Sequence, residues 1–138
     1  MRKVLLAAIG VLLLVLLLVP FEVHATECVA IPLKPVHHVW GVVVNQAGEF
    51  VSGATVTVLK GSDTIASAKT GADGRFAFDQ LKAGTYDIRV DANGYLSALS
   101  PITLVKPNSN RKKGLEVLLA VGMGCSVMGV HKIKEPKQ

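Results

Sequence analysis

The chain has 138 residues, which gives room for one domain. Aromatic residues make up only 5%, so the core must be aliphatic, and 13 glycines with 6 prolines favour short strands and turns over long helices. The net charge of +5 is not evenly spread: residues 26–105 hold six basic and seven acidic residues, whereas residues 106–138 hold seven basic and two acidic ones.

Residues 1–25 have the three-part architecture of a secretory signal. A basic start is followed by an apolar run at 4–19, and a proline ends that run. Cleavage is predicted between Ala25 and Thr26, so we expect a secreted or periplasmic protein. The alternative is an uncleaved signal anchor, and only in that case would the protein be attached to a membrane. The apolar run of 16 residues is shorter than the roughly 20 residues that span a bilayer.

The two cysteines, Cys28 and Cys125, lie near the two ends of the mature part. An even number of cysteines in an exported chain predicts a disulfide, with two unpaired thiols as the alternative. Glu27 stands where a lipoprotein signal has a small residue, which argues against lipidation of Cys28. Neither cysteine has a partner at zinc-binding spacing, so a metal or redox role is not expected.

The mature chain is predicted to be all-β. Residues 26–38 form an extended lead-in, and from 39 to 121 apolar and polar residues alternate between regularly spaced turns, as in a sandwich or barrel. Seven strands are expected, and 122–138 are left as a basic C-terminal tail. The residues predicted to face inward are Val42, Val44, Val56, Val58, Phe76, Phe78, Leu81, Tyr86, Ile88, Val90, Ile102, Leu104, Leu115, Val117 and Leu119.

Several separated motifs, in a fixed order, resemble one known family. They are Gly41-Val42-Val43-Val44, Gly53-Ala54-Thr55-Val56-Thr57-Val58, Thr70-Gly71-Ala72-Asp73-Gly74-Arg75-Phe76, Leu81-Lys82-Ala83-Gly84-Thr85-Tyr86-Asp87-Ile88 and Ala92-Asn93-Gly94-Tyr95. Together they resemble the carboxypeptidase regulatory-like domain. The resemblance implies a transthyretin-like (prealbumin-like) seven-stranded Greek-key β-sandwich. It also implies a module that supports folding, spacing or binding beside other domains. Tyr86, shortly after Gly84, is placed like a tyrosine corner.

No catalytic site or cofactor is expected. The mature part has only three histidines, and His37 and His38 are adjacent, so in a strand they would point to opposite faces. No carboxylate is spaced to complete a metal site with His131. The chain also lacks the Tyr-Arg-Gly-Ser ending of 5-hydroxyisourate hydrolases, which have a similar architecture. No Lys, Asn and acid occupy inward positions for an isopeptide crosslink.

The expected function is that of an exported, non-catalytic structural or interaction module whose partner is an unknown protein or an envelope glycan. In the glycan alternative, exposed rings at Trp40 and Tyr95, with Phe50 nearby, would stack on sugars. The basic clusters are expected to be solvated loop and tail. No aromatic residue interleaves with them, so no nucleic-acid partner is expected.

Overall fold

A computed structural model describes residue 28 and residues 31–106, 113–122 and 124–133. Within these residues the protein is all-β, and no helix is long and apolar enough to cross a membrane. The predicted signal and its cleavage site at Ala25 and Thr26 lie outside the described residues. The strands are β1 (Val39–Asn45), β2 (Thr55–Lys60), β3 (Asp63–Lys69), β4 (Arg75–Phe78), β5 (Gly84–Asp91), β6 (Ala98–Leu104), β7 (Lys113–Leu119) and β8 (Val127–Lys132).

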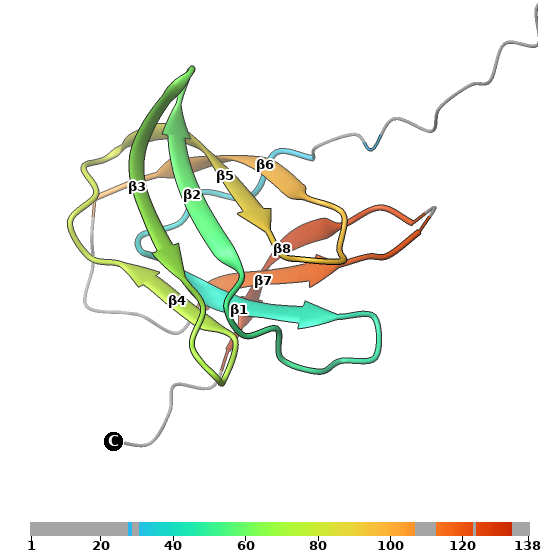
Figure 1. Ribbon diagram of the computed structural model, residues 1–138. Helices are drawn as coiled ribbons and strands as arrows, with labels where there is room; N and C mark the ends of the chain where they lie inside the picture. The colour runs from blue at the N-terminus through green and yellow to red at the C-terminus, as the bar shows by residue number, and fades with distance from the viewer. Residues whose placement is uncertain (1–27, 29–30, 107–112, 123, 134–138) are drawn as a thin grey trace, which may run out of the picture.

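The strands form two packed sheets, one in the order β4-β1-β7-β8 and the other in the order β3-β2-β5-β6 (Figure 1). β1 and β7 are parallel, and all the other neighbours pair antiparallel. β6 lies beside β8 on one edge of the sandwich, and β3 lies beside β4 on the other. The sandwich therefore has two lateral edges, and the N-terminal lead-in runs along the edge formed by β6 and β8.

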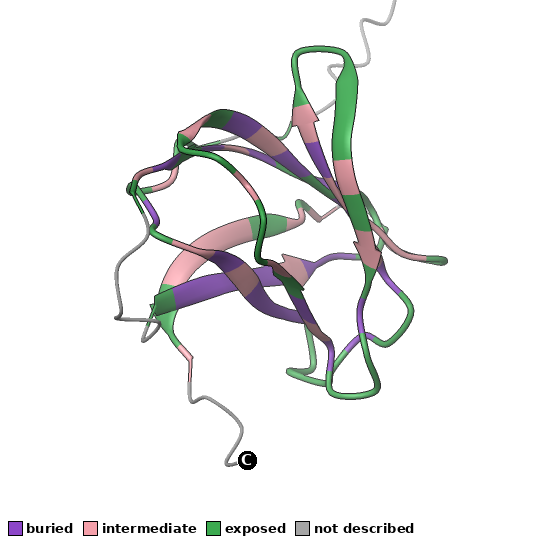
Figure 2. Ribbon diagram, turned by 90° about the vertical axis from the view of Figure 1, so that its left-hand side faces the viewer, coloured by how far each residue is buried: buried purple, intermediate pink, exposed green. Residues whose placement is uncertain are grey.

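The core lies between the sheets and is mainly aliphatic, as the composition predicted. Val43, Val56, Val58, Ile88 and Val90 are fully shielded from solvent, and Figure 2 shows the buried positions in purple, lining the space between the two layers. Burying such alternating faces is the main stabilising contribution in a domain of this kind, at about 25 cal/mol for each Å² of apolar surface.

Two turn and corner predictions are confirmed. Gly74 adopts φ +68°, the left-handed conformation expected after Asp73 in this turn. The ring of Tyr86 is buried, and its hydroxyl donates a hydrogen bond of 2.8 Å to the carbonyl of Lys82. The tyrosine corner thus fixes the chain where it enters β5.

The structure corrects the facing of β1. Val42 and Val44 were predicted to face inward, but Val39 and Val43 join the core instead. Val42 is also buried, but it lies on the outer face of its sheet, where its register partners are Arg75 and Glu116. Three consecutive valines carry no alternation of their own, so only the pairing with β4 and β7 sets which face each one occupies.

The predicted count of seven strands is one short, because the segment 122–138 contains β8 rather than being only a tail. β8 pairs antiparallel with β7 along its length. The sequence of β8 alternates weakly because the apolar residues Val127 and Met128 are adjacent. In the structure Val127 is exposed, whereas Met128 and Val130 pack against the core. The predicted seventh strand also ends too late, since β7 stops at Leu119 and Val121 is exposed.

Candidate interaction surface

The predicted disulfide between Cys28 and Cys125 is present, with the two Cα atoms 5.7 Å apart. It joins residues 97 positions apart and fastens the start of the described chain to the loop between β7 and β8. This confirms the pairing prediction over the alternative of two free thiols.

The lead-in that follows Cys28 covers part of the free edge of β6. The N–H of Val36 donates to the carbonyl of Thr103 at 2.9 Å, and the N–H of Val105 donates to the carbonyl of Val36 at 2.9 Å. The N–H of Leu33 makes a longer bond of 3.3 Å to Pro101. Exposed strand edges are prone to pair with other chains, and covering them is a common protection. Here the lead-in supplies that cover for the second half of β6.

A shallow hollow of about 140 Å³ lies on the same edge, beyond the part that the lead-in covers. β6 and the segment before it form one wall, the start of β8 forms the other, and the disulfide borders it. The lining residues are Cys28, Ile31, Ser97, Leu99, Ser100, Ser126, Val127 and Met128.

Three of the seven large apolar side chains that are exposed in the described residues gather around this hollow. Ile31 is 71% exposed, Leu99 is 50% exposed and Val127 is 51% exposed. Contiguous exposed apolar groups of this kind mark contact sites in soluble domains. The volume is well below the roughly 300–1,000 Å³ of pockets that enclose small ligands, so the hollow suits a single inserted side chain better than a cofactor.

Hydrogen bonds hold the two walls of the hollow together. The Ser126 hydroxyl donates to the carbonyl of Leu96 at 2.6 Å and accepts the N–H of Ala120 at 2.9 Å. The N–H of Leu96 donates in turn to the carbonyl of Ala120 at 2.8 Å. The loop before β6 is thus bonded directly to the loop after β7, which fixes the hollow between the two sheets.

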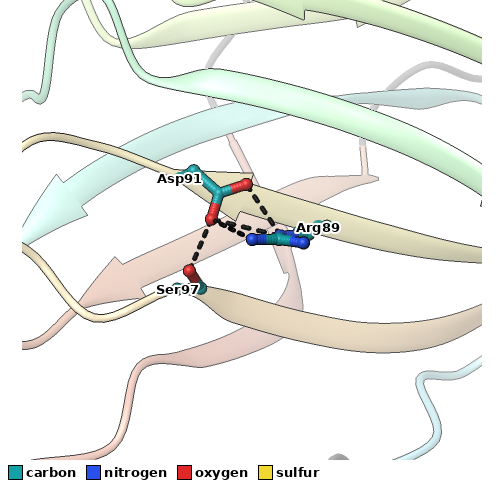
Figure 3. Close-up of polar contacts among 3 residues, drawn as sticks. All are labelled: Arg89, Asp91 and Ser97. Carbon is teal, nitrogen blue, oxygen red and sulfur yellow. Dashed lines mark hydrogen bonds and ion pairs between the residues drawn. The ribbon is translucent and has the colours of Figure 1, made fainter.

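A polar cluster fixes Ser97 at the rim of the hollow (Figure 3). The Asp91 carboxylate accepts hydrogen bonds from the guanidinium of Arg89, with Nε 2.8 Å from Oδ2, and from the hydroxyl of Ser97. Both charged side chains are partly exposed, at 53% for Arg89 and 36% for Asp91. The cluster joins the end of β5 to the residue just before β6 across the turn between them. Its role is therefore structural, because it stabilises that turn.

The structure does not bring Trp40 and Tyr95 together. Trp40 lies on the outer face of β1, against Gly114 at the start of β7. Tyr95 precedes Leu96, which bonds to Ala120 just past the end of β7, and its ring packs against the core. The two half-buried rings are therefore separated by the length of β7, about 20 Å for a strand of this size. Phe50 is 60% exposed in the loop after β1.

The histidines come from two separate segments, the lead-in before β1 and the strand β8. The Nδ1 of His37 is 2.7 Å from the carbonyl of Lys106, to which it donates, and the His131 ring lies against Gly129 on β8. Within the part of the chain that the structure describes, no group of three or more His, Cys, Asp or Glu side chains is placed to hold a metal ion.

Sequence reasoning missed the hollow. Leu99 and Val127 lie 28 positions apart, and each looks like an ordinary strand residue. One signal was available, since the disulfide prediction already placed the start of the mature chain beside residue 125.

A family model for the carboxypeptidase regulatory-like domain matches residues 38–115. Among solved structures, the chain is similar to 5-hydroxyisourate hydrolase from Klebsiella pneumoniae, with 20% identity and a TM-score of 0.54 over 72% of this chain and 100% of that one. It is also similar to sea bream transthyretin in complex with thyroxine, with 11% identity and a TM-score of 0.48 over 72% and 98% of the two chains. No curated protein matches the chain.

Proposed function

Because the chain belongs to the carboxypeptidase regulatory-like domain family and has its transthyretin-like sandwich, we propose that it is an exported, non-catalytic module that binds a protein partner. The observation that carries the proposal is the gathering of Ile31, Leu99 and Val127 around the hollow beside the disulfide. A partner would insert one apolar side chain between β6 and β8. Central apolar anchors of this kind supply most of the binding energy in protein interfaces.

Three features support export. The first 25 residues have the pattern of a secretory signal. The disulfide is of the kind that persists in oxidising compartments and is rare in the cytosol. The match to the carboxypeptidase regulatory-like domain is also consistent with a location outside the cytoplasm. The expected product is a periplasmic or secreted protein that begins at Thr26, and intact mass determination on the exported fraction tests this start site and the disulfide together.

Site-specific photo-crosslinking in the producing cells tests the partner. A benzophenone side chain is placed at Leu99 or Val127, and the control carries it at Ile65, which is 46% exposed on β3 at the opposite edge. We expect one discrete crosslinked protein, the same from positions 99 and 127, and none from position 65. Equal crosslinking from all three positions would show nonspecific contact and would overturn the proposal.

The competing partner is an envelope glycan that stacks on Trp40. In that case no protein adduct would form at positions 99 and 127, and Trp40→Ala would abolish retention on cell-envelope polysaccharide. The non-catalytic part has its own test: the purified protein is expected to leave the rate of 5-hydroxyisourate hydrolysis at the uncatalysed value.

A further inference from the structure

Three lysines lie at the end of the sandwich that is away from the disulfide. Lys113 begins β7 and Lys132 ends β8, and the two are directly opposite in the register of that pair. Lys106 follows the end of β6, the strand that lies beside β8, and His37 donates to its carbonyl. All three lysines are exposed. We call these residues the lysine end.

Strand alternation directs two of these side chains to the mouth between the sheets. Leu115 and Val117 of β7 face the core, so Lys113 shares their side of the strand. Val130 of β8 packs against the core, so Lys132 also lies on the inner side, two residues further along. Both ammonium groups therefore emerge at the open end of the core, towards the end of β6.

The lysines of this cluster take no part in the ion pairs that join Arg75 with Asp73 and Arg89 with Asp91. Asp63 and Asp79 lie at the same end of the sandwich but on its other edge. Asp63 begins β3, and Asp79 directly follows β4. Like charges directly opposite each other on paired strands destabilise a sheet, so the fold itself gains nothing from Lys113 facing Lys132.

The chemistry of the cluster fits a polymer that carries repeated anions. An ammonium group binds phosphate, sulfate or carboxylate as a point charge, without the planar geometry that arginine imposes. Exposed lysines bind a single small anion weakly. A chain with several linked anions gains from multivalency, because each further contact is intramolecular.

The surroundings of the lysine end favour a polysaccharide over the other polyanions. Membrane-surface sites add inserted apolar side chains to their basic groups, but Ile31, Leu99 and Val127 gather around the hollow on the disulfide side. Single-stranded nucleic acid sites stack bases on exposed aromatic rings. The ring beside the lysine end is Trp40, which is half-buried against Gly114 on the outer face of β1, whereas Lys113 and Lys132 lie on the inner side. The exposed ring of Phe50 lies in the loop after β1, at the far end of that strand. We propose that the lysine end binds an acidic polysaccharide. Because this surface is separate from the hollow, the inference does not depend on the protein partner proposed above.

The test uses the disulfide-bonded protein and polygalacturonate as the probe, with dextran as a neutral polymer. We expect binding to polygalacturonate that weakens as NaCl rises from about 50 to about 300 mM, and none to dextran. The double variant Lys113→Gln/Lys132→Gln should bind about 10-fold more weakly. The matched control Lys60→Gln/Lys69→Gln removes the same charge from β2 and β3 and should change binding by less than about 2-fold.

Circular dichroism and melting temperature establish that both double variants are folded. An equal loss in the two variants would show that only net charge matters and would overturn the site. Tighter binding to vesicles that contain anionic phosphatidylglycerol, or to single-stranded DNA, than to polygalacturonate would assign the lysine end to a different polyanion and would also overturn the proposal.

Discussion

The hydroxyl of Ser126 donates a hydrogen bond of 2.6 Å to the carbonyl of Leu96, and this contact bonds the loop after β7 to the segment that leads into β6. The same hydroxyl accepts the N–H of Ala120. One short side chain therefore satisfies two backbone groups from different sheets, at the point where the exposed apolar residues of the hollow gather.

Ser126→Ala is expected to lower the free energy of unfolding by about 1–2 kcal/mol, because the carbonyl of Leu96 and the N–H of Ala120 each lose a partner. Urea denaturation measures the change. Ser67→Ala on the exposed face of β3 is the control and should have an effect within about 0.5 kcal/mol. If the two variants are equally stable, Ser126 does not link the sheets in this way.

Removal of the disulfide should destabilise the protein more than any single hydrogen bond does. The bond closes a loop of 97 positions, and loss of this constraint in Cys28→Ser/Cys125→Ser is expected to cost up to about 4–5 kcal/mol. Thermal unfolding with and without dithiothreitol checks this: the reductant should lower the melting temperature of the wild type and leave the double variant unchanged. A reductant effect of the same size on both proteins would contradict the assignment.

Thr70 is a buried polar residue whose hydroxyl bonds two backbone groups. It donates to the carbonyl of Val51 at 2.7 Å and accepts the N–H of Ala54 at 2.9 Å. Thr70→Val keeps the shape but leaves both groups unpaired, and we expect a loss of about 2–3 kcal/mol in the free energy of unfolding. Thr103→Val, at an exposed position of β6, is the control and should be close to neutral.

Gly41 is required by the close approach of β1 to β7. A Cβ atom at this position would stand 2.0 Å from the carbonyl oxygen of Leu115, so Gly41→Ala must open the parallel pairing of the two central strands. We expect a loss of about 3 kcal/mol or more, measured by urea denaturation. At Gly48, which has free space but a φ of +79°, the same substitution should cost only about 1 kcal/mol.

The sandwich was predictable where each strand carries its own alternation. In β5, Tyr86, Ile88 and Val90 alternate with charged residues, and their burial follows the sequence directly. In β1 and β8 the apolar residues fall on both faces, so the alternation is ambiguous. The predictions that Val42 and Val44 face inward and that the sandwich has only seven strands were therefore wrong. A period of two identifies a half-buried strand only if one of its faces is polar.

By itself, the sequence predicted the all-β class, the turn at Gly74, the corner at Tyr86 and, with two free thiols as the alternative, the pairing of Cys28 with Cys125. Each depends on local patterns or, for the cysteines, on having only one possible partner. Only the tertiary structure decided that Leu99 and Val127 border one hollow and that Lys113 and Lys132 stand opposite each other. These surfaces arise from the order of strands in the sheets. That order depends on long-range pairing and the burial of both inner faces, which no short stretch of sequence encodes.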